Sequence, residues 1–250
     1  MKQQTLLITG ASGGIGSATA ELAAARGWAV ALHYGKGRAS AEAVAERIAA
    51  AGGLAKVFGA DMGAEEEIAA MFRAVDSALP PLGGLVNNAA RVAPRKVSVS
   101  DLAATEINDV LSVNVTGAMI AGREAAARLS TARGGPGGVI VNVSSRAVNH
   151  AAPHLWVHYA ASKAALDTFT RGFALELAEE GIRVNGVRPG LIDTPIHARA
   201  GMADRVARAE KRLPMGRAGR PGEVAEAIIW LASDAASYVT GATLDVGGGA

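Results

Sequence analysis

Short apolar runs alternate along this chain with longer segments in which apolar residues, many of them alanine, recur at helical spacing. The apolar runs predict seven strands, at residues 5–9, 29–34, 55–59, 84–87, 139–143, 183–187 and 243–246. The intervening segments predict helices over about 15–27, 39–51, 64–78, 101–130, 157–180 and 222–233. Strands that alternate with helices form a parallel sheet covered on both faces.

The predicted fold is therefore α/β, a Rossmann-type doubly wound, seven-stranded parallel sheet with helices on both faces. Residues 1–250 are expected to form a single domain. The glycine- and proline-rich run 133–138 has the composition of a linker, but neither side of it contains a complete sheet, which favours a loop. The segment from Gly190 to Pro221 has no clean strand, and long excursions of this kind are usually functional lids or disordered.

Charge and composition exclude several classes of function. Lys and Arg number 25 against 23 Asp and Glu, interspersed along the chain, so no basic stripe for nucleic acid or a membrane is expected. The chain has no cysteine, and its five histidines lack metal-ligand spacing, so no catalytic metal is expected. Without a signal-peptide pattern at its start, and with Glu21 and Arg26 interrupting the apolar stretch 18–32, the protein is expected to be cytoplasmic.

A glycine-rich turn lies where the first strand must lead into the first helix. It contains Gly10, Ser12, Gly13, Gly14, Ile15 and Gly16. Glycines at this position allow a close approach of the backbone, and the N–H groups of a helix start bind a diphosphate. The placement between a strand and an alanine-rich helix favours a dinucleotide site.

The residues after the second strand favour NADP(H), with NAD(H) as the alternative cofactor. Tyr34 is followed by Lys36 and Arg38, with no acid to hold ribose hydroxyls. The other interpretation is that both cations are solvated loop charges, since Gly13 stands where NADP enzymes often carry a basic side chain. Asp61, after the third strand, would accept a hydrogen bond from adenine or cap the helix beginning near Ala64.

Further motifs appear in the order and spacing of one family. They are the glycine turn, Asn87-Asn88-Ala89-Ala90, Asn114, Ser144-Ser145, Tyr159 with Lys163, and Pro189-Gly190. Over its whole length the chain resembles the short-chain dehydrogenases/reductases, most of all bacterial sugar-dehydrogenase-like and 3-oxoacyl-carrier-protein-reductase-like members. The sequence departs from that pattern in Ala90, which stands where the family has glycine. The interval from Ser145 to Tyr159 is also one residue longer than the common spacing, which keeps Ser144 as a second candidate for the catalytic hydroxyl.

The resemblance implies the roles of the site residues. The cofactor would contact the glycine turn, Tyr34, Lys36, Arg38, Asp61, Met62, Asn88, Ala89, Ala90, Tyr159, Lys163, Pro189, Gly190, Ile192 and Thr194. Ile192 and Thr194 would hold the nicotinamide carboxamide, and Asn114 would support a water relay to Lys163. The segment at about 191–220 would cover the substrate.

Tyr159 and Lys163 are four residues apart, so on a helix they share one face with Cβ atoms about 5–6 Å apart. A nearby ammonium favours a phenolate, and Tyr159 would exchange a proton with the substrate while Ser145 hydrogen-bonds its oxygen. The structural alternatives are a turn cap for Ser145, a helix kink for Asn114 and an interface aromatic for Tyr159.

The expected activity is NADP(H)-dependent transfer of a hydride between the nicotinamide and a small carbonyl/alcohol substrate. Two alternatives are a sugar dehydrogenase using NAD or NADP and a non-catalytic dinucleotide-sensing protein. The family resemblance and two long alanine-rich helices predict a homotetramer.

Overall fold

The computed structural model describes residues 3–250 apart from 94, 196–200, 203 and 210–212. Its centre is a seven-stranded sheet in the order β3-β2-β1-β4-β5-β6-β7, in which every neighbouring pair is parallel. The strands are β1 (Thr5–Ile8), β2 (Ala29–Tyr34), β3 (Ala55–Gly59), β4 (Leu82–Asn87), β5 (Gly138–Val143), β6 (Ile182–Pro189) and β7 (Thr243–Val246). The order reverses beside β1, as in a doubly wound sheet, so the predicted fold class is confirmed.

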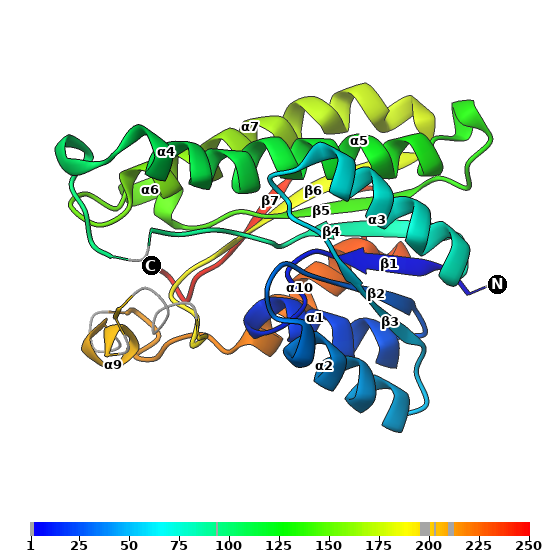
Figure 1. The fold of residues 1–250 in the computed structure, drawn as a ribbon, viewed down its shortest axis with the longest axis horizontal. Coiled ribbons are helices and arrows are strands. Elements are labelled where there is room, and N and C mark those ends of the chain that lie inside the picture. The colour runs from blue at the N-terminus through cyan, green and yellow to red at the C-terminus, as the bar shows by residue number, and fades with distance from the viewer. Residues whose placement is uncertain (1–2, 94, 196–200, 203, 210–212) are drawn as a thin grey trace.

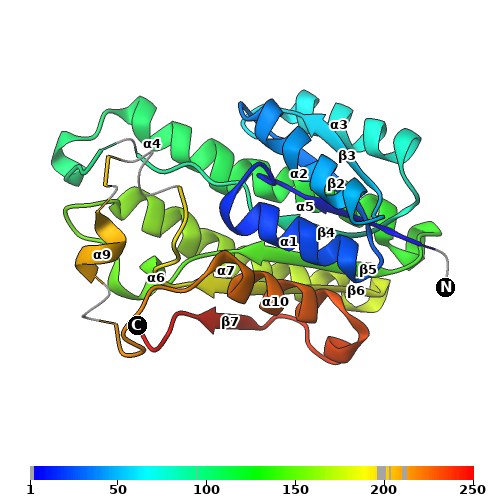
Figure 2. The ribbon, with the colours of Figure 1, turned by 90° about the horizontal axis from the view of Figure 1, so that it is seen from below.

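The helices cover both faces of the sheet (Figures 1 and 2). One face carries α1 (Gly14–Ala25), α2 (Arg38–Ala50) and α10 (Pro221–Ala232). The other carries α3 (Glu65–Ala78), α5 (Ala118–Leu129) and α7 (Val157–Leu177). The short helices α4 (Ala104–Leu111), α6 (Ala147–His150) and α9 (Arg205–Ala209) gather at one end of the molecule, at the left of Figure 1.

The period of two along each strand divides the apolar core between the two faces. Leu6 and Ile8 of β1 pack under α1 and α10, whereas Leu7 packs on the side of α3 and α5. All three are fully buried. Because both faces are covered, the strands are continuous apolar runs, which is the pattern that predicted them.

The helix expected over 101–130 is interrupted. A short 3-10 turn (Val99–Asp101) comes first, and α4 then leads through a π-helical segment (Ser112–Gly117) into α5. A Cβ atom at Gly117 would lie 2.0 Å from the Met62 carbonyl oxygen, so the segment passes very close to the end of β3. The widened turn accommodates this approach and directs Asn114 inward.

Two short helices lie outside the predicted set. The first is α6, directly after β5, and the second is α9, inside the segment from Gly190 to Pro221. No regular strand forms in the described part of that segment, but Ile192 makes a single bridge with Gly219. The glycine- and proline-rich run 133–138 connects α5 to β5, which pairs with strands from both sides of the run.

None of the helices described by the structure combines the length and apolarity needed to cross a membrane.

Candidate active site

The carboxyl ends of β1, β4, β5 and β6 meet along one edge of the sheet. The glycine turn follows β1, and Asn88 follows β4. Ser144 and Ser145 follow β5, and Gly190 follows β6. Ligands of open parallel sheets bind at this edge, on either side of the point where the strand order reverses.

The glycine turn could not hold larger side chains at its tightly packed positions. Its backbone therefore stays accessible to a ligand. Gly10 has a φ of +67°, a conformation that side chains disfavour. A Cβ atom at Gly16 would lie 2.3 Å from the Gly10 carbonyl oxygen. At Gly13, in contrast, no atom would lie within 4 Å of an added Cβ. This open, glycine-lined start of α1 fits the diphosphate of a dinucleotide.

Two residues that the sequence analysis did not single out hold this turn. Thr9 Oγ1 accepts hydrogen bonds from the N–H groups of Asn88 (2.9 Å) and Ala89 (3.0 Å). His33 Nδ1 accepts the Gly10 N–H at 3.0 Å, and its Nε2 lies 2.9 Å from the Ala60 carbonyl oxygen, so the proton belongs on Nε2. Burial lowers the pKa of His33 and keeps the ring neutral, as this pair of contacts requires.

Asn88, which follows β4, connects the glycine turn to that strand through hydrogen bonds. Its side-chain amide donates to the carbonyl oxygens of Thr9 (2.9 Å) and Gly10 (3.1 Å). The next residue but one, Ala90, is exposed and does not have a positive φ, so alanine fits where the family pattern has glycine. Asn88 and Ala89 thus contact the start of the glycine turn through Thr9 and Gly10.

The cations after β2 lie in the loop next to the glycine turn. Lys36 and Arg38 are both exposed, and Arg38 Nε donates to Glu42 Oε1 at 2.8 Å. A Cβ at Gly37 would lie 3.2 Å from Ser12 Oγ, which brings this loop against the turn. The Tyr34 ring packs over β3 at Gly59.

Asp61 does not cap α3 in the expected way, because Ala64 is the residue before the helix and its side chain forms no cap hydrogen bond. The carboxylate instead accepts the Gly63 N–H at 2.8 Å, which stabilises the turn that follows β3. The main chain of Met62 passes against Gly117 in this same turn.

Tyr159 and Lys163 lie on α7 and face the end of β5. The Lys163 Nζ atom is 5.7 Å from the centroid of the Tyr159 ring and donates to the Val143 carbonyl oxygen at 2.7 Å. Lys163 is buried, and burial lowers its pKa to about 8 in spite of the opposing charge of Asp167.

Burial raises the pKa of Tyr159, while a hydrogen bond with Ser145 and the charge of Arg205 act to lower it. From the sequence, the nearby Lys163 ammonium was expected to favour the phenolate of Tyr159. In the protein alone, the loss of solvation raises the pKa of Tyr159 by more than the nearby groups lower it, because a phenolate loses more solvation than a phenol.

The two serines after β5 have different partners. Ser144 is buried, and its hydroxyl donates to the Lys163 carbonyl oxygen at 3.1 Å. Ser145 is the serine that bonds with the Tyr159 phenol, and it also accepts the Ala147 N–H at 3.1 Å. This difference favours Ser145 over Ser144 as the hydroxyl that faces a substrate.

Asn114 joins the π-helical segment to the loop after β4 and to α7. Its side chain accepts the Arg91 N–H at 2.7 Å and donates to the Arg91 carbonyl oxygen at 3.0 Å. It also donates to Ser162 Oγ at 3.0 Å, and Ser162 in turn donates to the Tyr159 carbonyl oxygen at 2.7 Å. The site residue and the helix distortion, treated as alternatives in the sequence analysis, are therefore parts of one arrangement.

The interval between Ser145 and Tyr159, one residue longer than the common spacing, contains a segment with unusual backbone geometry. After α6 the chain turns through Ala151, Ala152 and His154, which have φ values of 56°, 44° and 55°. Positive φ is costly for residues with side chains and persists only where surrounding contacts fix it. This turn places Trp156, which is 4% exposed, beside Tyr159.

The loop after β6 reaches back to the glycine turn. Pro189 accepts the Arg146 N–H at 2.9 Å, and a Cβ at Gly190 would lie 2.7 Å from Gly247 Cα. The methyl group of Thr194 would lie 3.3 Å from a Cβ at Gly14, so this loop reaches the glycine turn. Ile192 is buried.

An apolar cluster lies beside Tyr159. We call it the Trp156 cluster. Its buried members are Ala93, Val97, Ala147, Ala152, Trp156, Ala160 and Met202, with Tyr159 packed against them. The residues come from the loop after β4, from α6, α7 and the turn between them, and from the segment before α9. A ligand at Tyr159 would thus meet apolar side chains here.

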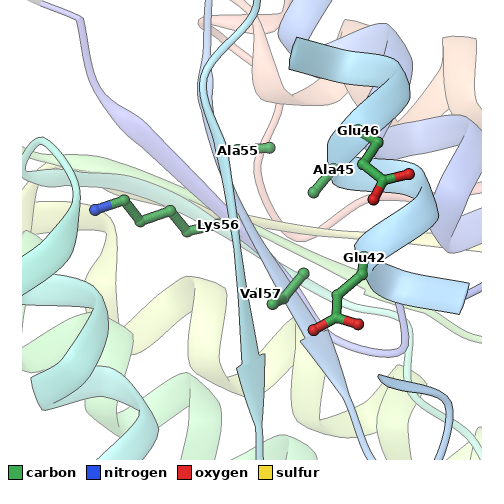
Figure 3. Close-up of a pocket in the computed structure, with 6 residues that line it drawn as sticks. All are labelled: Glu42, Ala45, Glu46, Ala55, Lys56 and Val57. Atoms are coloured by element: carbon green, nitrogen blue, oxygen red, sulfur yellow. The ribbon is translucent and has the colours of Figure 1, made fainter. Parts of the chain in front are cut away.

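A separate shallow pocket lies between α2 and β3 (Figure 3). It is lined by Glu42, Ala45, Glu46, Ala55, Lys56 and Val57. Lys56 points away from α2 in this view, and none of the candidate site residues lines the pocket. We assign it no role in the site.

Comparisons with known proteins find relatives that cover nearly the whole chain. A family model described as enoyl-(acyl carrier protein) reductase matches residues 10–250. An uncharacterized oxidoreductase of Escherichia coli, YgfF, is 49% identical over 97% of this chain and 98% of its own length. The 3beta-hydroxysteroid dehydrogenase 1 of Eggerthella lenta is 42% identical over 100% of this chain and 94% of its own. A short-chain type dehydrogenase/reductase from Mycobacterium marinum superposes with a TM-score of 0.91 at 34% identity, covering 98% and 94% of the two chains.

Proposed function

The chain belongs to the short-chain dehydrogenase/reductase family, an enzyme family that acts on alcohol and carbonyl groups with a nicotinamide dinucleotide, and from this premise we propose its specific reaction. We propose that it transfers a hydride between NADP(H) and a small carbonyl/alcohol substrate, with Tyr159 as the proton donor or acceptor. The observation that carries this proposal is the meeting of Tyr159, Ser145 and Lys163 at the end of β5.

The cofactor assignment is supported by the shape of the edge. Gly16 approaches the Gly10 carbonyl too closely for any side chain, while the backbone at Gly13 faces open space. Beyond this turn, Lys36 and Arg38 offer two cations to a 2′-phosphate. When bound, the dinucleotide would supply or accept the hydride. Thr194, whose methyl group lies against Gly14, and Ile192, in the same loop after β6, are proposed to border its nicotinamide.

The chain's own residues move the proton. In the direction of reduction, the Tyr159 phenol donates its proton to the carbonyl oxygen as negative charge develops there, and Ser145 donates a hydrogen bond to the same oxygen. The Lys163 ammonium stabilises the phenolate left behind. In oxidation the phenolate accepts the proton of the alcohol. Asn114 and Ser162 are proposed to orient the helix turn that carries the tyrosine.

The Trp156 cluster favours an alcohol or ketone with an apolar body over a sugar. Recognition of a sugar requires hydrogen-bonding side chains for its hydroxyl groups, and unpaired hydroxyls would be costly against these apolar residues. The relative named for a hydroxysteroid is consistent with an apolar substrate. A dinucleotide sensor without turnover would have no need of the Tyr159, Ser145 and Lys163 group.

The proposal is tested by replacing the phenol alone. Tyr159→Phe keeps an aromatic ring of nearly the same volume but removes the proton. With NADPH and a panel of ketones, β-ketoesters and sugars, we expect turnover to fall on the order of a hundredfold or more, with NADPH affinity unchanged. Tyr238→Phe, at a tyrosine outside the candidate site whose side chain is exposed in the single chain, is the matched control. Full activity of Tyr159→Phe would refute the assigned mechanism, and equal activity with NADH would refute the cofactor assignment.

We also propose that the protein is a homotetramer. Leu175 and Tyr238 are exposed large apolar side chains, 73% and 103% accessible, on α7 and close to β7, and association would bury them. Light scattering at micromolar concentration measures the assembly. A monomer mass would contradict the proposal.

A further inference from the structure

Arg205 differs from the other arginines around the site. Three of those arginines form ion pairs with acidic residues, namely Arg91 with Asp109, Arg95 with Glu106 and Arg146 with Asp245. Arg205 forms no ion pair with any residue that the structure describes, although its side chain is partly buried. A cation that is withdrawn from water without an acidic partner is costly and calls for an explanation.

The position of Arg205 is set by Trp156. The guanidinium carbon lies 4.9 Å from the centroid of the indole ring, in a cation–π contact. The indole is itself fixed, because it is buried in the Trp156 cluster and donates its N–H to the Arg95 carbonyl oxygen at 3.3 Å. The guanidinium of Arg205 is therefore held by a rigid aromatic surface.

The same indole contacts the proposed proton donor. The rings of Trp156 and Tyr159 meet edge-on, with centroids 6.1 Å apart. Arg205 and Tyr159 thus contact one side chain, and the two are near enough for the guanidinium charge to lower the pKa of the phenol while burial lowers the pKa of Arg205. A small molecule whose oxygen lies at Tyr159 would reach this cation.

Given the reaction proposed above, on which this inference rests, we infer that the substrate is an oxo or hydroxy carboxylic acid whose carboxylate is bound by Arg205. The planar guanidinium presents paired N–H groups that match the two oxygens of a carboxylate. The apolar part of the acid would pack on Trp156 and its neighbours, including Met202. In the reduction, the carbonyl carbon receives the hydride of NADPH and its oxygen the proton of Tyr159, while the carboxylate is unchanged.

The position of Arg205 in the chain gives this contact a second consequence. α9 lies in the segment after β6 that the sequence analysis expected to cover the substrate. A bound carboxylate would connect this helix to the floor of the site at Trp156. The contact would therefore select the acid and also hold α9 over it.

The test compares oxo acids with their uncharged methyl esters. The pairs are 3-oxobutanoate, 4-oxopentanoate and 4-oxocyclohexanecarboxylate, each with its ester, assayed with NADPH. We expect kcat/KM to be roughly tenfold or more higher for at least one acid than for its ester, as a charge-assisted pair provides. Arg205→Met should remove this preference, with a larger fall in kcat/KM for the acid than for its ester. Arg208→Met, on the same helix at an exposed arginine paired with Asp204, should leave the preference intact.

A binding measurement separates this inference from the proposed reaction. In the presence of NADP⁺, cyclohexanecarboxylate should change the tryptophan fluorescence of the wild type saturably, and cyclohexanecarboxamide should not. Arg205→Met should lose the carboxylate response. If kcat/KM were equal for acids and their esters, or if the carboxylate response survived in Arg205→Met, the role of Arg205 would be overturned. The proposed reaction would be unaffected. Absence of turnover for every acid and ester, with the fluorescence response present, would refute the reaction and leave the anion site.

Discussion

The two sides of the site are built from different interactions. The cofactor side is a network of backbone and polar contacts, in which Thr9, His33 and Asn88 hold the glycine turn. The substrate side is an apolar cluster around Trp156, assembled from loops and short helices outside the sheet. Hydrogen bonds have a narrow geometry, whereas apolar packing tolerates substitution when volume is conserved. The proposed cofactor side is therefore fixed by the sheet, whereas the proposed substrate side is built from segments that can vary.

Lys163 lies between the two sides, and its replacement should have the largest effect. Lys163→Met should reduce turnover on the order of a hundredfold or more and weaken NADPH binding. It should also raise the free energy of unfolding by about 1–2 kcal/mol near pH 7. Burial that lowers the pKa from 10.5 to about 8 costs roughly 3 kcal/mol, while the lost hydrogen bond from the charged ammonium to Val143 contributes about 1.5 kcal/mol.

The gain in stability should depend on pH. The pKa of Lys163 is lower in the folded state than in the unfolded state, so folding favours the neutral amine, and the wild type gains stability as pH rises from about 8 toward 10.5. Denaturant unfolding across this range should show the advantage of Lys163→Met shrinking. Lys56→Met, at an exposed lysine of β3, is the control and should show no such trend. A loss of stability in Lys163→Met at pH 7 would show that the lysine supports the fold.

The close packing of the cofactor side is tested at Gly16. In Gly16→Ala the new methyl group would meet the Gly10 carbonyl oxygen at 2.3 Å and the Asn88 side chain at 2.6 Å, so the turn must shift. Overpacking of this kind costs about 1–3 kcal/mol, and NADPH affinity should fall tenfold or more. Gly172→Ala is the control, since no atom lies within 4 Å and the residue is inside α7. The control should gain about 0.5–1 kcal/mol in thermal unfolding.

Discrimination between the two nicotinamide cofactors tests the exposed part of the same side. Replacing Lys36 and Arg38 together with alanine should weaken NADPH binding roughly tenfold or more and leave NADH binding unchanged. Glu42→Gln should modestly strengthen NADPH binding, because the Glu42 carboxylate forms an ion pair with Arg38 and so competes with the phosphate. Arg47→Ala, which breaks an ion pair on the other end of α2, is the control. Competitive titration measures the affinity of each variant for NADPH and NADH. An unchanged preference in the double variant would favour the interpretation that Lys36 and Arg38 are solvated loop charges.

The smallest effect concerns His33. Its pKa is lowered in the folded state, so the unfolded chain binds more protons below about pH 6.5 and folding stability falls on acidification. A single histidine contributes a slope of at most about 1.4 kcal/mol per pH unit. His33→Asn, measured by denaturant unfolding between pH 7 and 5, should have a shallower slope than the wild type. An equal slope would assign the acid sensitivity to other groups, among which buried His158 also has a lowered pKa.

The sheet and the approximate positions of the long helices followed from the alternation of apolar runs and helical segments. The predictions for β2, β3 and β7 match the observed limits. The helix predicted over 101–130 was wrong as one continuous element. The interruption accompanies the close approach of Gly117 to Met62, a contact between residues far apart in sequence that local periodicity does not reveal. The short helices α6 and α9 were missed because four or five residues carry too little periodicity to be recognised.

The sequence by itself determined which residues carry the candidate chemistry, since the glycine turn, Tyr159 and Lys163 depend on local spacing in a strand–helix unit. Tertiary structure decided the rest. It chose Ser145 over Ser144 as the partner of Tyr159, placed His33 under the glycine turn, and set Arg205 on Trp156. Each of these contacts joins segments whose relation is fixed only when the chain is packed. Spacing along one element is a local property, whereas the direction of a side chain toward another element depends on how the two elements pack.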